Sequence, residues 1–320
     1  MSIRILLAGA WCALVTTSVA AQDYPNKPVR LIVPYAAGGS SDILARLYGQ
    51  RLSETLGQTF VVDNRPGAGG MIGTDLLSRC APDGYSLMLQ DMPHTINPAV
   101  YNKVPYDPVK DFTPITLVAR APQWLFVYPG VAAKTVAELV ALAKAQPDLL
   151  KVGSAGNGSG THLMAELFIR GASVKLNHVP YKGAGPAVTA TVAGEMNMVF
   201  TSMPAAVAFV QAGRLRPVGV TTARRHPSHP EVPTFEESGV SNMILTHWFG
   251  VLAPAGLPKT VQDKLYRKVT AAVNHPTLVE RYKTLVIEAA TLTPAEFRAL
   301  IESDLARWTK VVKEANIKAL

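Results

Sequence analysis

Three glycine-rich loops recur along the chain, and each lies between a strand-like run and a segment with helical periodicity. They are Ala37-Gly38-Gly39-Ser40, Gly67-Ala68-Gly69-Gly70 and the segment 153–160. The first loop follows the apolar run 29–34 and precedes apolar residues that are spaced along one helical face. Strand, glycine loop and helix in alternation predict an α/β fold, in which a parallel or mixed sheet has helices on both faces.

Loops of this kind favour the binding of anions. A helix N-terminus presents unpaired N–H groups and about half a positive charge, and glycine lets ligand oxygens approach that backbone. Ser154 and Ser159 could donate hydroxyl hydrogen bonds to a carboxylate or phosphate, or could simply cap the following helix. The alternative for the glycines is that they only make tight turns.

Two further segments place polar groups beside expected helices. Lys182 precedes a glycine-to-helix transition, where it could attract an anion or be solvated. Thr201 and Ser202 follow the strand-like run 196–200 and supply hydroxyl groups without charge.

The length of 320 residues predicts about two domains, with room for a cleft between them. The β-rich stretch 114–128, broken at Ala121-Pro122, is the expected crossing to the second domain, and the runs 215–222 and 248–253 are the expected return crossings. Helices are expected at 135–145, 161–170, 184–194 and 204–213 and in the tail from residue 258.

The net charge of +8 suggests an anionic partner, but its distribution argues against nucleic acid. The basic residues are scattered, the longest basic run is Arg224-Arg225, and no aromatic residues alternate with basic ones. A small anion is therefore the better candidate.

Residues 1–21 read as an export signal: Arg4 precedes an apolar stretch that ends in small residues and is too short to span a bilayer. Cleavage would leave Cys80 without a partner for an intramolecular disulfide, and we expect it to be a small core hydrophobe. The mature product is expected to be soluble and exported.

Motifs of other classes are incomplete. No phosphate-binding P-loop is present, and the dinucleotide pattern at Gly67, Gly69 and Gly73 misses by one residue. Ser159 lacks the glycine two positions earlier that a serine hydrolase would have, and His162 with Glu166 gives only half a metal site. No cofactor and no metal are therefore expected.

Six motifs in this order, from about residue 24 to the C-terminus, resemble the Bug (Bordetella uptake gene) family. They are Tyr24-Pro25 with Pro28-Val29-Arg30, the loop from Pro34 through Gly38-Gly39 to Asp42, Asp63-Asn64-Arg65-Pro66-Gly67-Ala68-Gly69-Gly70, Pro82-Asp83-Gly84-Tyr85, Pro180-Tyr181-Lys182-Gly183 and Ala253-Pro254-Ala255-Gly256-Leu257-Pro258. The resemblance implies a periplasmic solute receptor of a tripartite tricarboxylate transporter. It also implies a two-lobed type II binding-protein fold with the ligand between the lobes. We expect lobe 1 at 22–120 plus 225–320 and lobe 2 at 121–224.

The resemblance further implies that the loop from Tyr35 to Ser41 and the loop from Ser154 to Ser159, with His162, hold a ligand carboxylate from opposite lobes. Together with the residues discussed above, the expected ligand-binding set is Tyr35, Ala36, Ala37, Gly38, Gly39, Ser40, Asp42, Gly69, Gly70, Asp91, Ser154, Ala155, Gly156, Asn157, Gly158, Ser159, His162, Tyr181, Lys182, Gly183, Thr201 and Ser202.

Two positions depart from the pattern of the family. Thr201 stands where family members commonly have an acidic residue, and the strand end Gln90-Asp91-Met92 departs from the small hydroxyl residues that are expected there. The resemblance therefore leaves open which group of the ligand this part of the pocket contacts.

The sequence as a whole predicts a monomeric, non-enzymatic periplasmic receptor that closes on a small organic carboxylate and presents it to membrane transporter subunits. This receptor is expected neither to bind nucleic acid nor to insert into the membrane. Two alternatives stay open at this point: a secreted serine hydrolase that uses Ser159 and His162, and a receptor that reports to a signalling partner.

Overall fold

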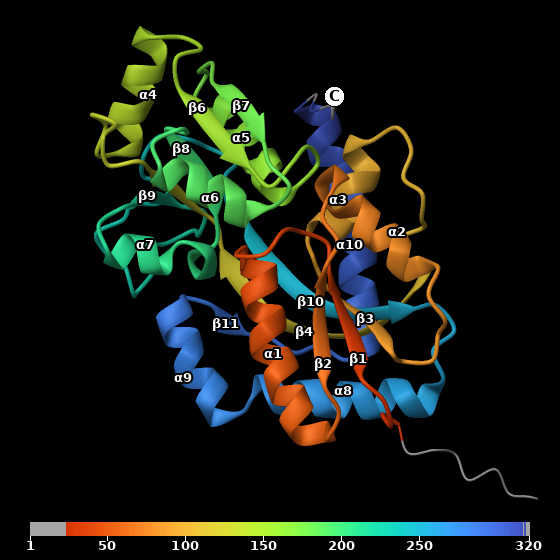
Figure 1. The fold of residues 1–320 in the computed structure, drawn as a ribbon. Coiled ribbons are helices and arrows are strands. Elements are labelled where there is room, and N and C mark those ends of the chain that lie inside the picture. Colours follow the sequence, from red (N-terminus) through yellow and green to blue (C-terminus); the bar gives the residue numbers. More distant parts are fainter. Residues whose placement is uncertain (1–23, 316, 318–320) are drawn as a thin grey trace, which may run out of the picture.

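The computed structural model describes residues 24–315 and 317, so the expected export signal at 1–21 lies outside the described residues. The chain forms two lobes, each built on one mixed sheet with flanking helices (Figure 1). The expected α/β architecture is confirmed. In the part of the chain that is described, no helix is both long and apolar enough to cross a membrane.

The first lobe contains a six-stranded sheet with the order β11-β4-β10-β3-β1-β2. Its strands are β1 (Val29–Val33), β2 (Phe60–Asn64), β3 (Ser86–Asp91), β4 (Phe112–Pro122), β10 (Thr246–Pro254) and β11 (Glu288–Ala289). The first three strands are parallel, whereas β10 returns antiparallel between β3 and β4.

Helices cover both faces of this sheet because its central strands are apolar on both sides. On β1, Leu31 and Val33 pack into one hydrophobic cluster with α1, and Ile32 packs into another with α2. The helices of this lobe are α1 (Ser40–Leu56), the 3₁₀ turn η1 (Ala68–Gly70), α2 (Met71–Ser78), α3 (Pro93–Val100), α8 (Lys259–Val273), α9 (Pro276–Leu285) and α10 (Pro294–Glu314).

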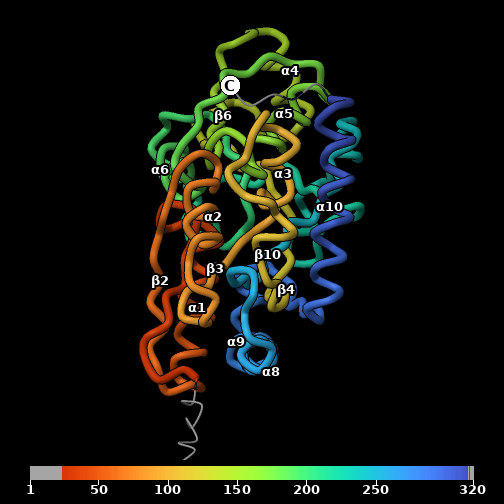
Figure 2. Tube along the Cα trace, turned by 90° about the vertical axis from the view of Figure 1, so that its right-hand side faces the viewer, coloured from red at the N-terminus to blue at the C-terminus, as the bar shows by residue number. Residues whose placement is uncertain are grey.

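The second lobe contains a five-stranded sheet with the order β7-β6-β8-β5-β9. Its strands are β5 (Trp124–Val127), β6 (Lys151–Ser154), β7 (Asn177–Pro180), β8 (Met198–Thr201) and β9 (Arg216–Val220). Its helices are α4 (Val136–Ala145), α5 (Gly160–Gly171), α6 (Ala184–Val192), the 3₁₀ turn η2 (Met203–Ala205) and α7 (Val207–Gln211). Figure 2 shows that α10, although it belongs to the first lobe, runs along one side of the molecule towards α5 of the second.

Thr221 ties together the segments that connect the lobes. Its hydroxyl accepts a hydrogen bond from the Gln123 N–H at 2.9 Å and donates one to the Leu245 carbonyl at 2.6 Å. Its backbone pairs with the same two residues. Because Gln123 lies between β4 and β5 and Leu245 just precedes β10, this one residue holds the crossings in register.

Some local expectations were wrong. The helix expected at 204–213 is divided into η2 and α7 at Ala206, which has a φ of −118°. No helix was expected at the position of α3, which contains Pro98. The tail is three helices interrupted by β11. Cys80 is only half-buried at the end of α2, and its thiol contacts the Leu76 carbonyl at 3.2 Å.

Candidate functional site

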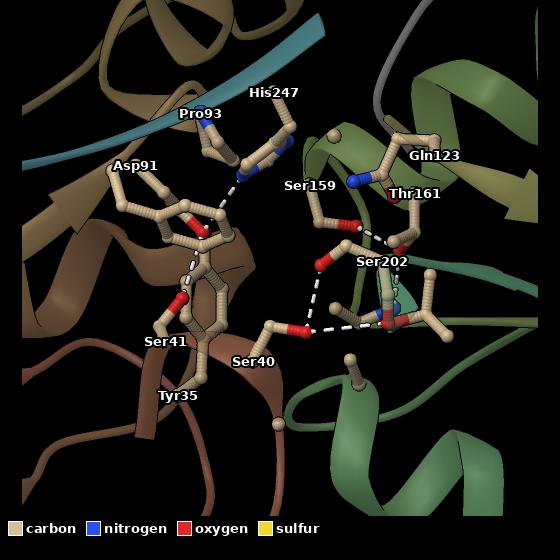
Figure 3. Close-up of a pocket in the computed structure, with 16 residues that line it drawn as sticks. Tyr35, Ser40, Ser41, Asp91, Pro93, Gln123, Ser159, Thr161, Ser202 and His247 are labelled. Atoms are coloured by element: carbon tan, nitrogen blue, oxygen red, sulfur yellow. Dashed lines mark hydrogen bonds and ion pairs between the residues drawn. The ribbon is translucent and has the colours of Figure 1, made fainter. Parts of the chain in front are cut away.

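A small cavity lies between the two lobes, at the carboxyl ends of β1, β3, β6 and β8 (Figure 3). Its lining comes from both lobes and consists of Tyr35, Gly39, Ser40, Ser41, Asp91, Pro93, Gln123, Ala155, Ser159, Gly160, Thr161, Ala184, Thr201, Ser202, His247 and Phe249. Ligands of open α/β sheets gather at this end of the strands, because the loops that leave it converge there.

The cavity is small in this closed arrangement. The space open to the centre of a water molecule is about 40 Å³, and since one water needs about 10–15 Å³ by this measure, there is room for about three. A ligand larger than that requires the lobes to move apart slightly.

Asp91 forms the polar wall on the side of the first lobe. Its Oδ1 accepts a hydrogen bond from the Tyr35 hydroxyl at 3.0 Å, and its Oδ2 accepts one from the Ser41 hydroxyl at 3.0 Å. Burial, together with the charge of Asp91, raises the pKa of Tyr35 well above its ordinary value. Tyr35 therefore stays a hydrogen-bond donor.

Asp42, which was expected in the site, supports the first loop from behind. Its carboxylate accepts hydrogen bonds from the Gly38 N–H, from Arg46 and from Asn64. Burial opposes ionisation of Asp42, but these hydrogen bonds outweigh it and lower the pKa below its ordinary value. The carboxylate therefore fixes the shape of the loop and does not line the cavity.

On the side of the second lobe, the wall is the beginning of α5. Ser159 caps this helix, since its hydroxyl accepts a hydrogen bond from the His162 N–H at 3.2 Å. The Thr161 hydroxyl lies 3.1 Å from that of Ser159 and accepts a bond from the Ala155 N–H. The helix N-terminus thus opens onto the cavity with its hydroxyl groups already oriented.

A pair of histidines lies under this loop. The His178 Nε2 is 2.6 Å from the hydroxyl of fully buried Ser154, and the rings of His162 and His178 lie 4.4 Å apart. Burial lowers the pKa of each to about 4, and for His178 the neighbouring His162 contributes as well. Both rings are therefore neutral at neutral pH.

The contacts of Ser159 and His162 also decide whether these residues could act as a catalytic pair, and the grouping of side chains decides whether a metal ion could bind. His162 Nδ1 accepts a hydrogen bond from the Gly158 N–H, and Ser159 contacts the His162 backbone and not its ring. A serine nucleophile paired with a histidine base is thus not assembled at Ser159. Among residues 24–315 and 317, no three His, Cys, Asp or Glu side chains are grouped so that they could hold a metal ion.

Several of the glycines in the expected ligand-binding set lie against the opposite lobe. A Cβ atom on Gly69 would lie 2.2 Å from the Asn157 carbonyl oxygen, and one on Gly183 would lie 2.9 Å from the Ala36 nitrogen. The Ala36 N–H donates to the Lys182 carbonyl at 2.9 Å. The lobes can approach this closely only where no side chain intervenes.

Eight of the expected residues line the cavity, namely Tyr35, Gly39, Ser40, Asp91, Ala155, Ser159, Thr201 and Ser202. The others do not line it and lie in the adjoining loops and element ends, namely Ala36, Ala37, Gly38, Asp42, Gly69, Gly70, Ser154, Gly156, Asn157, Gly158, His162, Tyr181, Lys182 and Gly183. The side chain of Lys182 is exposed. That these residues bind a ligand stays a prediction.

Eight lining residues were not named in the expected set, although Ser41 ends the loop 35–41 that was expected to hold the ligand: Ser41, Pro93, Gln123, Gly160, Thr161, Ala184, His247 and Phe249. Gly160 and Thr161 directly follow the expected loop 154–159, and Ala184 directly follows the expected Gly183, so slightly longer segments would have included them. Gln123 lies within the expected crossing 114–128, and His247 directly precedes the expected return crossing 248–253. These positions were the only signal available from the sequence.

Known proteins show the same fold and sequence pattern. The family model described as "Tripartite tricarboxylate transporter family receptor" matches residues 44–317. Protein BugT of Bordetella pertussis is 33% identical over 95% of this chain and 94% of its own length. The resemblance to the Bug family is confirmed.

Two solved structures superpose over almost the whole chain. The periplasmic binding protein BugD is 32% identical, with a TM-score of 0.89 over 92% of this chain and 99% of its own. A protein of R. palustris solved with adipate is 36% identical, with a TM-score of 0.89 over 93% of this chain and 100% of its own. The expected two-lobed fold of a periplasmic binding protein is thereby confirmed.

Proposed function

The chain belongs to the tripartite tricarboxylate transporter family of receptors, and we propose that it captures a small organic carboxylate between its lobes in the periplasm and delivers it to a membrane transporter. The similar protein solved with adipate supports a carboxylate ligand. Export by the segment 1–21 and contact with transporter subunits are parts of the same proposal.

The observation that carries the proposal is the position of two helix N-termini on one cavity. Gly39 and Ser40 begin α1 in the first lobe, and Ser159 and Gly160 begin α5 in the second. Backbone N–H groups and hydroxyls at such ends hydrogen-bond a carboxylate without a buried cation. No Lys or Arg is present among the described residues that line the cavity.

Binding is coupled to closure because the cavity has walls from both lobes. A ligand stabilises the closed state only through contacts that it makes better there, and Ser40 and Ser159 supply such contacts from opposite sides. We assign residues 225–245 to the moving body of the second lobe, because Phe235 packs against Phe168 and Phe200 and Thr234 bridges Val220. The boundary of the lobes on this side is then near residue 245.

Thermal unfolding and calorimetry of the full mature chain, with a panel of mono-, di- and tricarboxylates, test the proposal. A ligand at about 100 times its Kd should stabilise the folded state by about 2.7 kcal/mol. Stabilisation by sugars or uncharged amides, with none by any carboxylate, would refute carboxylate binding.

A further inference from the structure

Two buried polar atoms beside the cavity have no hydrogen-bond partner. They are Nδ1 of His247 and Oε1 of Gln123, on side chains that are only 5% and 2% exposed. Both side chains line the cavity, and both lie on crossings between the lobes (Figure 3). Buried polar atoms are nearly always paired, so a group that enters the cavity is expected to complete these two.

The chemistry of His247 is set by Asp91. Its Nε2 lies 3.2 Å from Oδ2 of Asp91, and an ionised carboxylate only accepts hydrogen bonds. Nε2 therefore donates to Asp91, and in the tautomer that carries its proton on Nε2 the Nδ1 atom is an acceptor. This nitrogen faces Gly160, where a Cβ atom would come within 3.3 Å of it, so no side chain of α5 fills that position.

The negative charge at this end of the cavity also favours a ligand group that donates hydrogen bonds. Asp91 is the one carboxylate among the described lining residues, and it is 5% exposed. Tyr35, Ser41 and His247 donate to it, but none of them is a permanent cation. A second ligand carboxylate placed here would meet a like charge in surroundings of low dielectric constant. A hydroxyl or ammonium group would instead find acceptors.

We propose that Asp91, His247 and Gln123 form the specificity end of the pocket and select a short carboxylate whose opposite end donates hydrogen bonds. This inference rests on the proposed function and names the substrate class: hydroxy or amino monocarboxylates rather than simple dicarboxylates. The helix N-termini hold the carboxylate, and the acceptors at the crossings hold the donor. Since the closed cavity holds only about three waters, ligands of three or four carbon atoms are the ones that need the least opening of the lobes.

Calorimetric titration of the mature chain with ligands of one length provides the test. The four-carbon set is butyrate, 4-hydroxybutyrate, 4-aminobutyrate and succinate, and the three-carbon set is propionate, 3-hydroxypropionate, β-alanine and malonate. The best donor-ended ligand should bind about tenfold or more tightly than the diacid and the simple acid of its set. The hydroxyl and ammonium arms show which donor is preferred.

Two substitutions test whether the preference for donor-ended ligands comes from Asp91 and His247. Asp91→Asn keeps the shape but removes the charge, and its amide can donate to His247, so the affinity ratio of diacid to donor-ended ligand should rise about tenfold. His247→Phe should weaken the donor-ended ligand selectively. Asp304→Asn is the matched control, because Asp304 is also a buried carboxylate that accepts from a ring N–H, that of Trp248 at 2.8 Å, but lies outside the cavity.

The outcomes separate this inference from the proposed function. Two results would refute the role of the specificity end while leaving carboxylate binding intact. The first is that the wild-type chain binds diacids as tightly as donor-ended ligands. The second is that Asp91→Asn and Asp304→Asn give the same ligand ranking. If no carboxylate binds, the proposed function fails and the inference fails with it. The wild-type titration decides the question even where a variant does not fold.

Discussion

The hydroxyl of Ser202 donates a hydrogen bond of 2.7 Å to the hydroxyl of Ser40, across the boundary between the two lobes. Ser40 is the first residue of α1, and Ser202 directly follows β8. Both also line the cavity. The same two hydroxyls thus hold the closed arrangement together and form part of the site, so opening the lobes exposes both to solvent or to an arriving ligand.

Ser202→Ala should shift the ligand-free protein towards the open state. One neutral hydrogen bond contributes about 1 kcal/mol, so the ratio of closed to open molecules should fall about fivefold. Small-angle X-ray scattering would report a larger radius of gyration. Ser303→Ala, which removes a hydroxyl bonded to the Leu300 carbonyl within α10, is the control and should leave the scattering unchanged.

Gly69→Ala should block closure, because its Cβ would lie 2.2 Å from the Asn157 carbonyl oxygen in the opposite lobe. Gly57→Ala is a matched control: its φ of 69° resembles the 60° of Gly69, but no atom lies near its Cβ position. Both variants should lose a similar, modest amount of stability from backbone strain, about 1 kcal/mol. Only Gly69→Ala should lose ligand affinity, and equal affinities by calorimetry would contradict the role of Gly69 in closure.

Gly185→Ala should weaken closure of the lobes without lowering the stability of the fold. Gly185 lies in α6 without a positive φ, but a Cβ there would approach the Ala37 carbonyl oxygen to 2.3 Å. Alanine suits a helix at least as well as glycine, so the melting temperature should not fall, whereas ligand affinity should drop. In Gly49→Ala, where the new contacts are 3.6 Å or longer, affinity should be retained.

Stability should decrease as the pH falls from about 6.5 to about 4. Burial lowers the pKa of His94 to about 4, while in the unfolded chain it titrates near 6.5. The unfolded state therefore binds a proton first, so the stability contributed by neutral His94 is complete above pH 6.5 and is lost by about pH 4. For this fully buried ring the loss is on the order of 3 kcal/mol.

Urea unfolding across this pH range would measure the effect. His94→Asn should be less stable than the wild type at pH 8, because it loses the hydrogen bond between His94 Nε2 and the Pro108 carbonyl, and its stability should fall less steeply towards pH 4. Parallel curves for the two proteins would show that His94 does not carry the pH dependence. The neutral pair of His162 and His178 should add to the wild-type slope in the same direction.

The fold class could be predicted from the sequence because each strand–loop–helix unit has a recognisable local pattern. An apolar run, a glycine loop and a helical periodicity follow one another at both α1 and α5, and the resemblance to the Bug family added the two lobes. Breaks inside an element were harder to foresee. Ala206 interrupts a continuous apolar pattern, and the change of sheet at Gln123 depends on the hydrogen bonds that Thr221 makes from far along the chain.

The site could be predicted only where it follows the ends of strands. Ser40 and Ser159 each lie in a loop that follows a parallel strand, at the carboxyl end of the sheet of their own lobe. Whether Gly69 faces a ligand or the other lobe depends on how the lobes meet, which no local pattern contains. His247 was missed for the same reason, since its contact with Asp91 joins two strands that are neighbours only in the folded sheet.

The insertion of β10 between β3 and β4 has a consequence for how the chain acquires its structure. The strands of the second lobe, from Trp124 to Val220, are contiguous in the chain, whereas the sheet of the first lobe waits for Thr246–Pro254. Until then β3 has one unpaired edge and β4 has two, since its other neighbour β11 follows only at Glu288–Ala289, and such edges invite pairing with other chains. We therefore expect the second lobe to fold first, and chains truncated before residue 246 to aggregate.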